Sequence, residues 1–276
     1  EGSSDLENQC LKAVGDATER MGEDGLRILR AYRFMDQRSR GLWEPDENLA
    51  HALITCGKML ENVSQERIWS EFKRILKGQN APQVLERMRK DGLLSRILPG
   101  WDAELEPQYK LSTTEQDVVA CRLVLLALDI PAERWRVLDH DMRSLTIPNV
   151  ERNRVLKLHQ IIGHLPDDSA SCRRYRIRVD AEVNAHLDIE STLNQSLAES
   201  VKSLLQKTKL PKGGVEPIVD GHILSKISDL PAGRRLGRLK EWLFRLQIDQ
   251  DLSTTEEILS LLDIVEWKTT NPEDWP

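Results

Sequence analysis

Two side chains of opposite charge near the start of the chain could together read a nucleobase. Asp24 and Arg27 are three residues apart, so on a helix they would project from one face. A carboxylate accepts a hydrogen bond from an exocyclic amine, and a neighbouring guanidinium donates to a ring nitrogen or a carbonyl oxygen. Cytosine and adenine both carry an amine beside a ring acceptor, whereas guanine and uracil present an N–H there. The pair could therefore select C and A, although an ordinary surface ion pair at a helix start has the same spacing.

Helices are expected to position these residues. Apolar side chains at helical spacing predict helices over residues 24–37, 49–60, 114–129 and 235–249. Ser64 is expected to cap a further helix that Gly78 ends. Aromatic residues make up only 5% of the chain, which argues against a strand-rich fold. The sequence therefore predicts an all-α, multi-helix fold, and its 276 residues suffice for two or more packing units.

The composition argues against several classes of protein. The longest apolar stretch, residues 118–130, is interrupted by Arg122 and is too short to cross a bilayer. The opening residues are polar and acidic, unlike a signal peptide. The four cysteines are scattered without C-x-x-C spacing, which predicts neither a zinc site nor a disulfide framework. We therefore expect a cytoplasmic protein with no membrane partner.

Two basic stretches could bind RNA although the net charge is −6. In the first stretch, arginines alternate with Tyr175 and Ile177, so phosphate contacts and a stacking ring could come from one short element. A solvated loop is the alternative there. Further along, Gly233 leaves the N-terminus of a predicted helix open to a phosphate. The residues predicted to bind RNA are Arg173, Arg174, Arg176, Arg178, Arg234, Arg235 and Arg238.

The order of motifs resembles a known family over most of the chain. Residues 14–34 contain V-G-D, a downstream Arg20, and E-D-G-L-R-I-L-R-A-Y-R-F. This run resembles the head–neck junction of the class II tRNA nucleotidyltransferases (CCA-adding enzymes) and bacterial poly(A) polymerases. The stretch V-S-Q-E-R-I-W-S-E-F at residues 63–72 resembles the helix that buttresses the neck in that family. Residues 219–243 resemble its tail, and the likeness is weakest over residues 130–210.

The resemblance implies roles for individual residues. Asp24 and Arg27 would read the base of an incoming CTP or ATP. Glu23 would support that pair, and Arg30 would belong to the same nucleotide-binding set. Three residues of the buttressing helix would hold the base-reading helix through ion pairs, namely Glu66, Arg67 and Glu71. Gly25 stands where the family commonly has proline.

The resemblance also implies an organisation. Residues 1–98 would form a neck, 99–210 a body and 211–276 an RNA-binding tail. In the family a preceding α/β head holds two Mg²⁺ ions through a D-x-D on a strand that follows a glycine turn. We expect this chain to lack that head, to contain no catalytic or metal-binding residue, and to be inactive alone. Asp139-His140-Asp141 spells D-x-D, but in a predicted helix without the turn, and one His-Asp pair gives little support to an HD phosphohydrolase.

The expected function is therefore that of the nucleotide-selecting and RNA-binding part of a tRNA nucleotidyltransferase. Its substrates would be CTP and ATP, with Mg²⁺ held by the head. Its partners would be the tRNA 3′ end, the acceptor arm and its own head domain. A poly(A) polymerase, or an enzyme that adds only CC or only A, remains open within the family. A non-catalytic helical RNA-binding scaffold is the alternative of another class.

Overall fold

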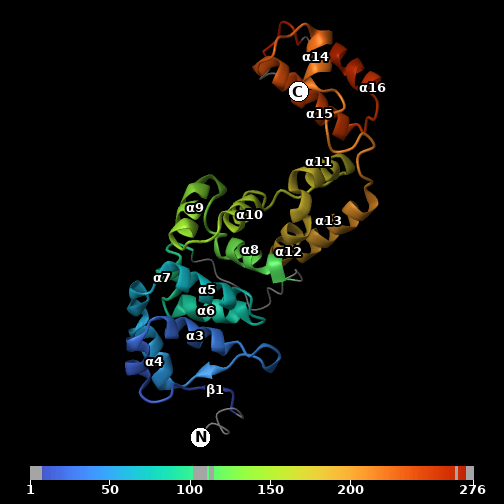
Figure 1. Ribbon diagram of the computed structural model, residues 1–276. Coiled ribbons are helices and arrows are strands. Elements are labelled where there is room, and N and C mark those ends of the chain that lie inside the picture. The colour runs from blue at the N-terminus through green and yellow to red at the C-terminus, as the bar shows by residue number, and fades with distance from the viewer. Residues whose placement is uncertain (1–7, 102–110, 112–114, 265–266, 272–276) are drawn as a thin grey trace. The chain divides into compact units, whose positions relative to one another are not determined.

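The protein is described by a computed structural model that covers residues 8–101, 111, 115–264 and 267–271. Over these residues the fold is all-α, as the sequence predicts, apart from two strands of two residues each (Figure 1). The chain divides into two compact units. The first comprises residues 1–163 and 184–194, and the second comprises residues 164–183 and 195–276. The predicted boundaries between neck, body and tail remain a prediction.

The first unit contains most of the helices. Its elements are β1 Cys10–Leu11, α2 Ala17–Glu23, α3 Leu26–Met35, η1 Arg38–Arg40, β2 Glu44–Pro45, α4 Glu47–Thr55, η2 Gly57–Asn62, α5 Gln65–Leu76, α6 Ala81–Lys90, α7 Leu94–Ile97, α8 Glu115–Leu126, η3 Ala132–Arg134, α9 Trp135–Ser144, α10 Asn149–Gln160 and nearly all of α12 Val183–Leu193. Here η denotes a 3₁₀ helix. None of the helices in the described part of the chain is long and apolar enough to cross a membrane.

The two short strands pair in parallel, with Cys10 opposite Glu44 and Leu11 opposite Pro45. A parallel pair needs a crossover connection, which α2 and α3 supply here. The pairing holds the segment before α2 beside the start of α4. Sequence patterning could not predict this ladder, because two residues are too few to show an alternation of polar and apolar positions.

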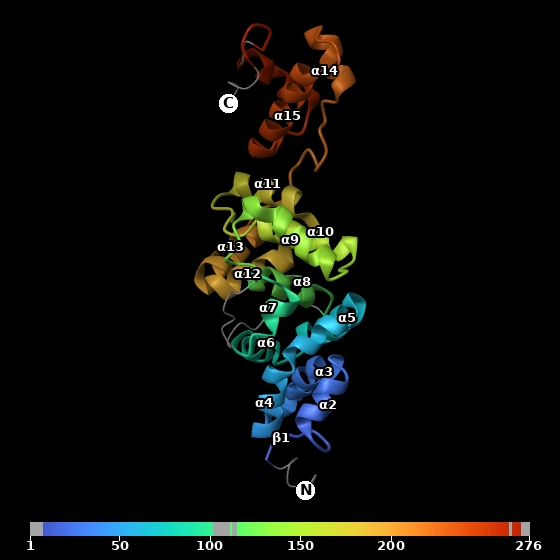
Figure 2. The same cartoon turned by 90° about the vertical axis from the view of Figure 1, so that its left-hand side faces the viewer.

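Helices α3 and α5 pack directly on each other, and α2 packs on α4 (Figure 2). On α3 the buried side chains include Ile28, Leu29 and Tyr32, while α5 contributes Phe72 and Leu76. Burial of each apolar side chain of this size contributes about 1.5–3 kcal/mol to stability. The buried stripe therefore fixes which face of α3 remains outside, and with it the position of the arginines between the apolar residues.

A buried hydroxyl ties α3 to α6. The Tyr32 Oη donates to Asp91 Oδ2 at 2.7 Å, and the same carboxylate oxygen accepts from Arg87 Nε at 2.7 Å. Burial, aided by the hydrogen bond to Asp91, raises the pKa of Tyr32 well above its usual value. The phenol therefore stays a hydrogen-bond donor, and the polar group adds direction to an otherwise apolar interface.

Some predicted helix boundaries are wrong in detail. The helix predicted over residues 49–60 is α4, which ends at Thr55, followed by the separate 3₁₀ helix η2. Residues 114–129 correspond to α8, which ends at Leu126, and Thr114 lies outside the described residues. Ser64 occupies the N-cap position of α5, but its side chain makes no capping hydrogen bond. Its carbonyl oxygen accepts from the amides of Arg67 and Ile68 instead.

The second unit has a small helical core. Its elements are α11 Ser169–Val179, η4 Asp180–Glu182, α13 Gln195–Lys207, α14 Gly221–Ser228, α15 Arg234–Asp249, α16 Thr255–Ser260 and η5 Leu261–Ile264. The core around α15 is built by Leu239, Leu243 and Trp242 together with Leu224 from α14 and Ile258 from α16. Helix α15 also packs on α11. It is therefore the central element of this unit.

Candidate functional site

The proposed base-reading residues lie at a break between two helices. Helix α2 ends at Glu23 and α3 begins at Leu26, with Asp24 between them in an extended conformation (φ −149°, ψ 111°). The prediction of one helix over residues 24–37 is therefore wrong at its start, and Asp24 and Arg27 do not share a helix face. The Asp24 Oδ1 accepts from the amide of Leu26 at 3.0 Å. This bond satisfies an amide that has no partner within the helix, which explains why α3 begins after Asp24.

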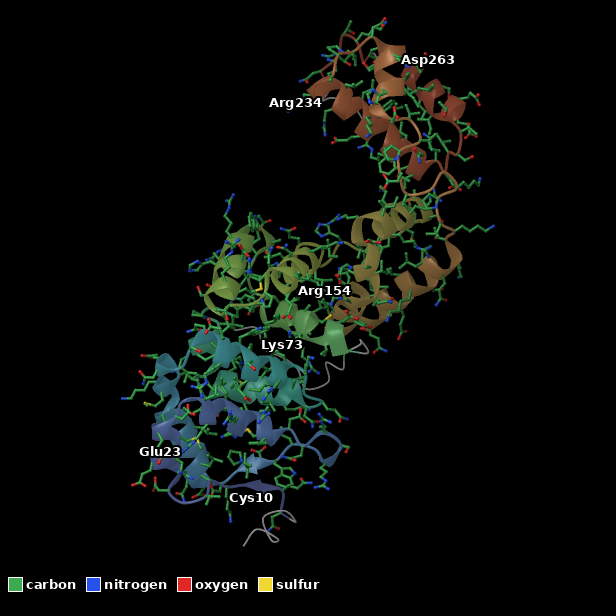
Figure 3. The ribbon with its side chains drawn as sticks, in the orientation of Figure 1. Cys10, Glu23, Lys73, Arg154, Arg234 and Asp263 are labelled. Atoms are coloured by element: carbon green, nitrogen blue, oxygen red, sulfur yellow. The ribbon has the colours of Figure 1, made fainter. Side chains whose placement is uncertain are left out.

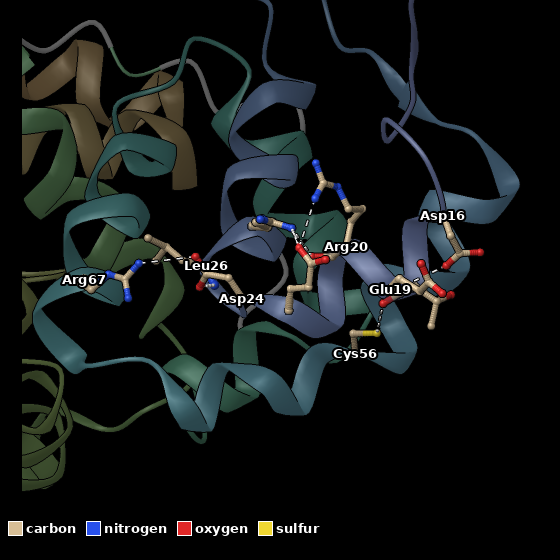
Figure 4. A network of polar contacts seen from close by, with 10 residues as sticks. Asp16, Glu19, Arg20, Asp24, Leu26, Cys56 and Arg67 are labelled. Atoms are coloured by element: carbon tan, nitrogen blue, oxygen red, sulfur yellow. Dashed lines mark hydrogen bonds and ion pairs between the residues drawn. The ribbon is translucent and has the colours of Figure 1, made fainter.

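The other Asp24 oxygen faces helix α5. Its Oδ2 lies 3.6 Å from Nη2 of Arg67, one of the residues predicted to support the site (Figure 4). The aspartate is thus held on one side by the start of α3 and on the other by a guanidinium from the neighbouring helix. These two contacts fix the direction of the carboxylate without using all of its acceptor positions.

Arg27 contacts the end of helix α2. Its Nη1 pairs with Glu23 and donates to the carbonyl oxygen of Arg20 at 3.0 Å, while Arg20 Nη1 lies 3.2 Å from the same Glu23 carboxylate. The hydrogen bond from Arg27 is the main cause that lowers the pKa of Glu23 below its usual value. Both of these Arg27 contacts use one nitrogen of a group with five N–H donors, so donors remain for a ligand.

A buried carboxylate on α5 holds three arginines in place. The side chain of Glu71 is 5% exposed, and its oxygens lie 3.1 Å from Arg74, 3.2 Å from Arg33 and 3.5 Å from Arg30. The structure thus brings Arg30 of the predicted nucleotide set together with Glu71 of the predicted supporting set. Glu66, by contrast, is exposed and makes no ion pair among the described residues.

Gly25 lies where α3 meets η2. Any Cβ at this position would overlap the carbonyl of Met59, because the two backbones are in direct contact. The backbone angles of Gly25 (φ −56°, ψ −25°) are ordinary ones, so space and not conformation requires glycine here. This contact accounts for glycine at a position where the family commonly has proline.

A cavity of about 290 Å³ opens beside this helix break. Three of its lining residues are arginines, and Phe34 is half-exposed within it. It is lined by Leu11, Lys12, Ala13, Val14, Arg20, Met21, Arg27, Arg30, Ala31, Phe34 and Leu49. Apolar walls with guanidinium groups among them suit a flat aromatic ligand, because arginine stacks on and hydrogen-bonds to a base. Asp24 does not line the cavity.

Arg20 is a residue that the prediction of site residues missed. It contacts Glu23 and lines the cavity with Arg27 and Arg30. Its spacing of three residues before Glu23 was a signal in the sequence, because that spacing places two side chains on one face of a helix. The signal was too common among surface ion pairs to single the residue out.

Three of the four arginines around Tyr175 have internal partners in the structure. They lie on the helix α11, so the alternative of a solvated loop is wrong. Arg173 donates from Nε to the carbonyl of Ile248 at 2.7 Å and from Nη2 to that of Asp249 at 2.7 Å. These carbonyls lie in the last turn of α15 and have no partner within that helix. Arg174 pairs with the Asp249 carboxylate, Arg176 donates to the Leu205 carbonyl, and Arg178 is exposed.

The three tail arginines lie in the first turns of α15. Arg235 Nη1 donates to the carbonyls of Trp267 at 2.6 Å and Lys268 at 3.0 Å, so it holds these two residues against the helix. Arg238 Nη1 lies 3.4 Å from Glu241. Arg234, labelled in Figure 3, is exposed. These positions leave Arg234 and Arg238 as the surface cations of this set.

The D-x-D sequence is not arranged as a metal site. Asp139 lies 3.0 Å from Arg152 and 2.9 Å from Arg143, and Asp141 accepts from the indole N–H of Trp101 at 3.1 Å. All the atoms of Asp139 that could bind a metal therefore face guanidinium groups. Among the described residues, no cluster of three His, Cys, Asp or Glu side chains could hold a metal ion. These residues do not fit the Mg²⁺ ions that the family's reaction needs.

Known proteins resemble the chain over most of its length. Residues 44–105 match the family described as "Probable RNA and SrmB- binding site of polymerase A". The CCA-adding enzyme of Streptococcus gordonii is 33% identical over 270 residues, which cover 94% of this chain and 64% of that protein. This chain is therefore similar in sequence to CCA-adding enzymes. The CCA-adding enzyme of Lactobacillus johnsonii is 28% identical over 270 residues, again 94% of this chain and 64% of that protein. The chain thus spans just under two thirds of the length of these relatives.

Solved CCA-adding enzymes have the same fold over this region. The Bacillus stearothermophilus enzyme in complex with CTP aligns with a TM-score of 0.63 at 19% identity, covering 95% of this chain and 67% of that one. The Thermotoga maritima enzyme complexed with tRNA-CCA aligns with a TM-score of 0.61 at 18% identity, covering 96% and 66%. At this level of identity, the likeness extends to the helical architecture of the family.

Proposed function

We propose that this chain is the nucleotide-selecting and RNA-binding part of an enzyme that adds C and A to the 3′ end of tRNA. The observation that carries the proposal is the helix break at Asp24. There an oriented carboxylate lies three residues before Arg27, which lines an apolar cavity with two further arginines. The sequence relatives, which are CCA-adding enzymes, support the same assignment.

The chemistry of selection follows from donors and acceptors. Asp24 accepts from the exocyclic amine of cytosine or adenine, and Arg27 donates to the neighbouring ring nitrogen or carbonyl. Guanine and uracil present an N–H where Arg27 also presents one. Two hydrogen-bond donors would then face each other, and no hydrogen bond would form. Arg67 keeps the Asp24 carboxylate in one direction, since its Nη2 lies 3.6 Å from Oδ2. Glu23 likewise fixes the direction of the Arg27 side chain through an ion pair.

Nucleotide binding tests this selection directly. We expect the chain to bind CTP and ATP more tightly than GTP and UTP in a calorimetric titration. Asp24→Asn should reduce that preference by about tenfold or more, because one good bidentate base contact is worth about 1–3 kcal/mol of discrimination. Glu66→Gln is the matched control, since it removes one exposed carboxylate that has no ion pair among the described residues. Equal binding of all four nucleotides by the unchanged chain would refute the selection.

The tRNA partner is tested by binding at two salt concentrations. The ligands are a tRNA that lacks its CCA end and an unrelated RNA hairpin. We expect tighter binding to the tRNA and a steep loss of affinity with salt, because helical RNA is recognised through its shape and phosphates. Equal affinity for both RNAs would favour the non-catalytic scaffold instead.

Transfer itself is proposed to need the head domain of the intact enzyme, which would bind Mg²⁺. Asp139 and Asp141 are held by Arg143, Arg152 and Trp101, so they offer no carboxylate pair to a metal. We therefore expect no incorporation of labelled CTP into the truncated tRNA when this chain is incubated with it and Mg²⁺. Incorporation above that of a heat-denatured control would overturn this part of the proposal.

A poly(A) polymerase is the second candidate, and one observation favours it. The family that matches residues 44–105 is named for a polymerase A. An enzyme that adds only A has no use for cytosine, so binding of ATP without CTP would favour this candidate. Binding of both nucleotides would favour addition of CCA.

A further inference from the structure

A second and larger cavity lies in the first unit, between the ends of α3 and α5. Its volume is about 470 Å³. Four of its lining side chains are cationic, namely Arg33, Arg38, Arg74 and Lys77. Among the described residues that line this cavity, Asp36 is the one that carries a carboxylate. A cavity with this excess of positive charge favours an anionic ligand.

The carboxylates near the cavity are already engaged. Asp36 accepts from the Asn80 amide at 2.8 Å, from the Asn80 side chain at 2.9 Å and from the Arg38 amide at 2.8 Å. Glu71 faces Arg33 and Arg74. The side chains of Arg38 and Lys77 are exposed and make no ion pair or hydrogen bond within the described part of the chain. Two positive charges at the cavity are therefore available to a ligand.

Phe34 connects this cavity with the one beside the helix break, because it lines both. Its side chain is 50% exposed, and the Arg33 guanidinium lies 4.7 Å from the ring centre. An exposed ring under a guanidinium is a surface on which a base can stack. The two cavities thus meet at a stacking side chain.

Lys77 extends the connection in the other direction. It also lines a third cavity of about 210 Å³, whose wall includes Lys73 and Arg154 (Figure 3). Shared lining residues therefore link three neighbouring cavities of the first unit. We call this series, from the helix break through Phe34 to Lys77, the cationic track. A mononucleotide carries its phosphates beside one base, whereas an RNA strand presents a phosphate at every step of such a path.

We propose that the cationic track binds the single-stranded 3′ end of the RNA substrate. Phe34 stacks on one base, while Arg38 and Lys77 bind backbone phosphates. The inference rests on the proposed function, because the strand must lead to the helix break at which the incoming nucleotide is read. It adds binding residues to that function that lie outside the Asp24 and Arg27 pair.

The test measures binding of a labelled single-stranded RNA of about twelve nucleotides by fluorescence anisotropy at several salt concentrations. The double variant Arg38→Gln/Lys77→Gln should bind about tenfold more weakly at low salt. Its dependence of log K on log salt should be shallower by about 1.4, since each phosphate contact to a single strand contributes about 0.7. Phe34→Leu should weaken binding about tenfold and leave the salt dependence unchanged, because stacking does not displace counterions.

The matched control is Lys58→Gln/Arg136→Gln. It removes two exposed cations of the same unit that line none of the three cavities. We expect the control to bind RNA as the unchanged chain does. An equal loss in both double variants would show a general charge effect and overturn the proposal. Absence of any single-strand binding by the unchanged chain at low salt would do the same.

A parallel titration with CTP separates the two sources of phosphate. If the Arg38 and Lys77 variant lost affinity for CTP but not for RNA, the cavity would hold a triphosphate and the track would be wrong. Asp24→Asn should leave binding of the single strand unchanged. The chain could show no preference for tRNA over the hairpin while the track variants still bind single-stranded RNA more weakly. That outcome would refute the proposed function and support the cationic track. The track variants and the Lys58→Gln/Arg136→Gln control should have the thermal unfolding midpoint of the unchanged chain, because their altered side chains are exposed.

Discussion

Asp24 and Arg67 are 43 positions apart in the chain, yet the Asp24 Oδ2 lies 3.6 Å from Nη2 of Arg67. One residue lies between α2 and α3, and the other lies on α5, which packs against α3. The contact couples the direction of the proposed base-reading carboxylate to the packing of two helices. Arg67 is therefore a positioning residue in the proposed site.

Arg67→Gln should weaken CTP binding about three- to tenfold and leave the fold intact. The pair is partly exposed, so its loss costs stability only about 0–1 kcal/mol, whereas the freed carboxylate loses its fixed direction. Calorimetric titration with CTP measures the first effect and thermal unfolding the second. Arg96→Gln is the control, because Arg96 forms a similar exposed pair with Glu61 at 3.3 Å. If the unchanged chain, Arg67→Gln and Arg96→Gln bound CTP with equal affinity, Arg67 would have no role in the site.

Gly25→Ala should destabilise the protein by about 1–3 kcal/mol. A Cβ there would overlap the Met59 carbonyl, which forces α3 away from η2. Gly22→Ala is a close control, since Gly22 lies in α2 and a Cβ would meet nothing within 4 Å. That control should stabilise the protein by about 0.5–1 kcal/mol through the helix propensity of alanine. Denaturant unfolding of both variants measures the difference, and equal effects would contradict the contact.

Arg173→Ala should reduce the stability of the second unit by about 2 kcal/mol. Its guanidinium caps α15 by donating to two carbonyls at 2.7 Å, and hydrogen bonds from a charged group contribute about 1.5–3 kcal/mol. Arg178→Ala, on the same helix but exposed, should leave stability unchanged. If Arg178 contacts RNA as the sequence predicts, that variant should weaken tRNA binding instead. Unfolding and tRNA titration of both variants separate the two roles. Unchanged stability in Arg173→Ala would refute the cap.

Asp220 should make the stability of the second unit depend on pH in the acid range. Its Oδ1 caps α14, accepting from the amides of His222 and Ile223 at 2.8 Å each. The hydrogen bond from the Ile223 amide is the main cause that lowers the pKa of Asp220 below its usual value. Because the folded pKa lies below the unfolded one, the stabilisation is complete above the unfolded pKa and is lost as pH falls through the folded pKa.

Asp220→Ser tests this dependence, because serine keeps a capping oxygen that does not titrate. The unchanged chain should be at least as stable as the variant at pH 7. Its advantage should shrink as the pH falls from about 5 through the lowered pKa of Asp220, since the carboxylate becomes protonated over that range. Thermal unfolding over that pH range measures the difference. A difference that stays constant with pH would contradict a titrating cap.

Local patterns in the sequence predicted most of the helices and the likeness to CCA-adding enzymes. The apolar spacing that predicts α5 and α15 is strong, because one face of each helix is buried along its whole length. The motif around Asp24 and Arg27 could be recognised because its residues are close together in the chain. The helical class and the residues to examine were thus accessible without a structure.

Only the tertiary structure decided how the charged side chains are used. Asp24 lies outside the helix because its carboxylate satisfies the Leu26 amide, which no periodic pattern reveals. Arg173 lies in an arginine-rich stretch that resembles a phosphate-binding segment. In the structure it instead caps a helix that begins some sixty residues later in the chain. Glu71 gathers three arginines, and the cationic track collects cations from several elements. A charge can find a partner at any separation in sequence, so its role follows from the folded positions of the helices and not from local spacing.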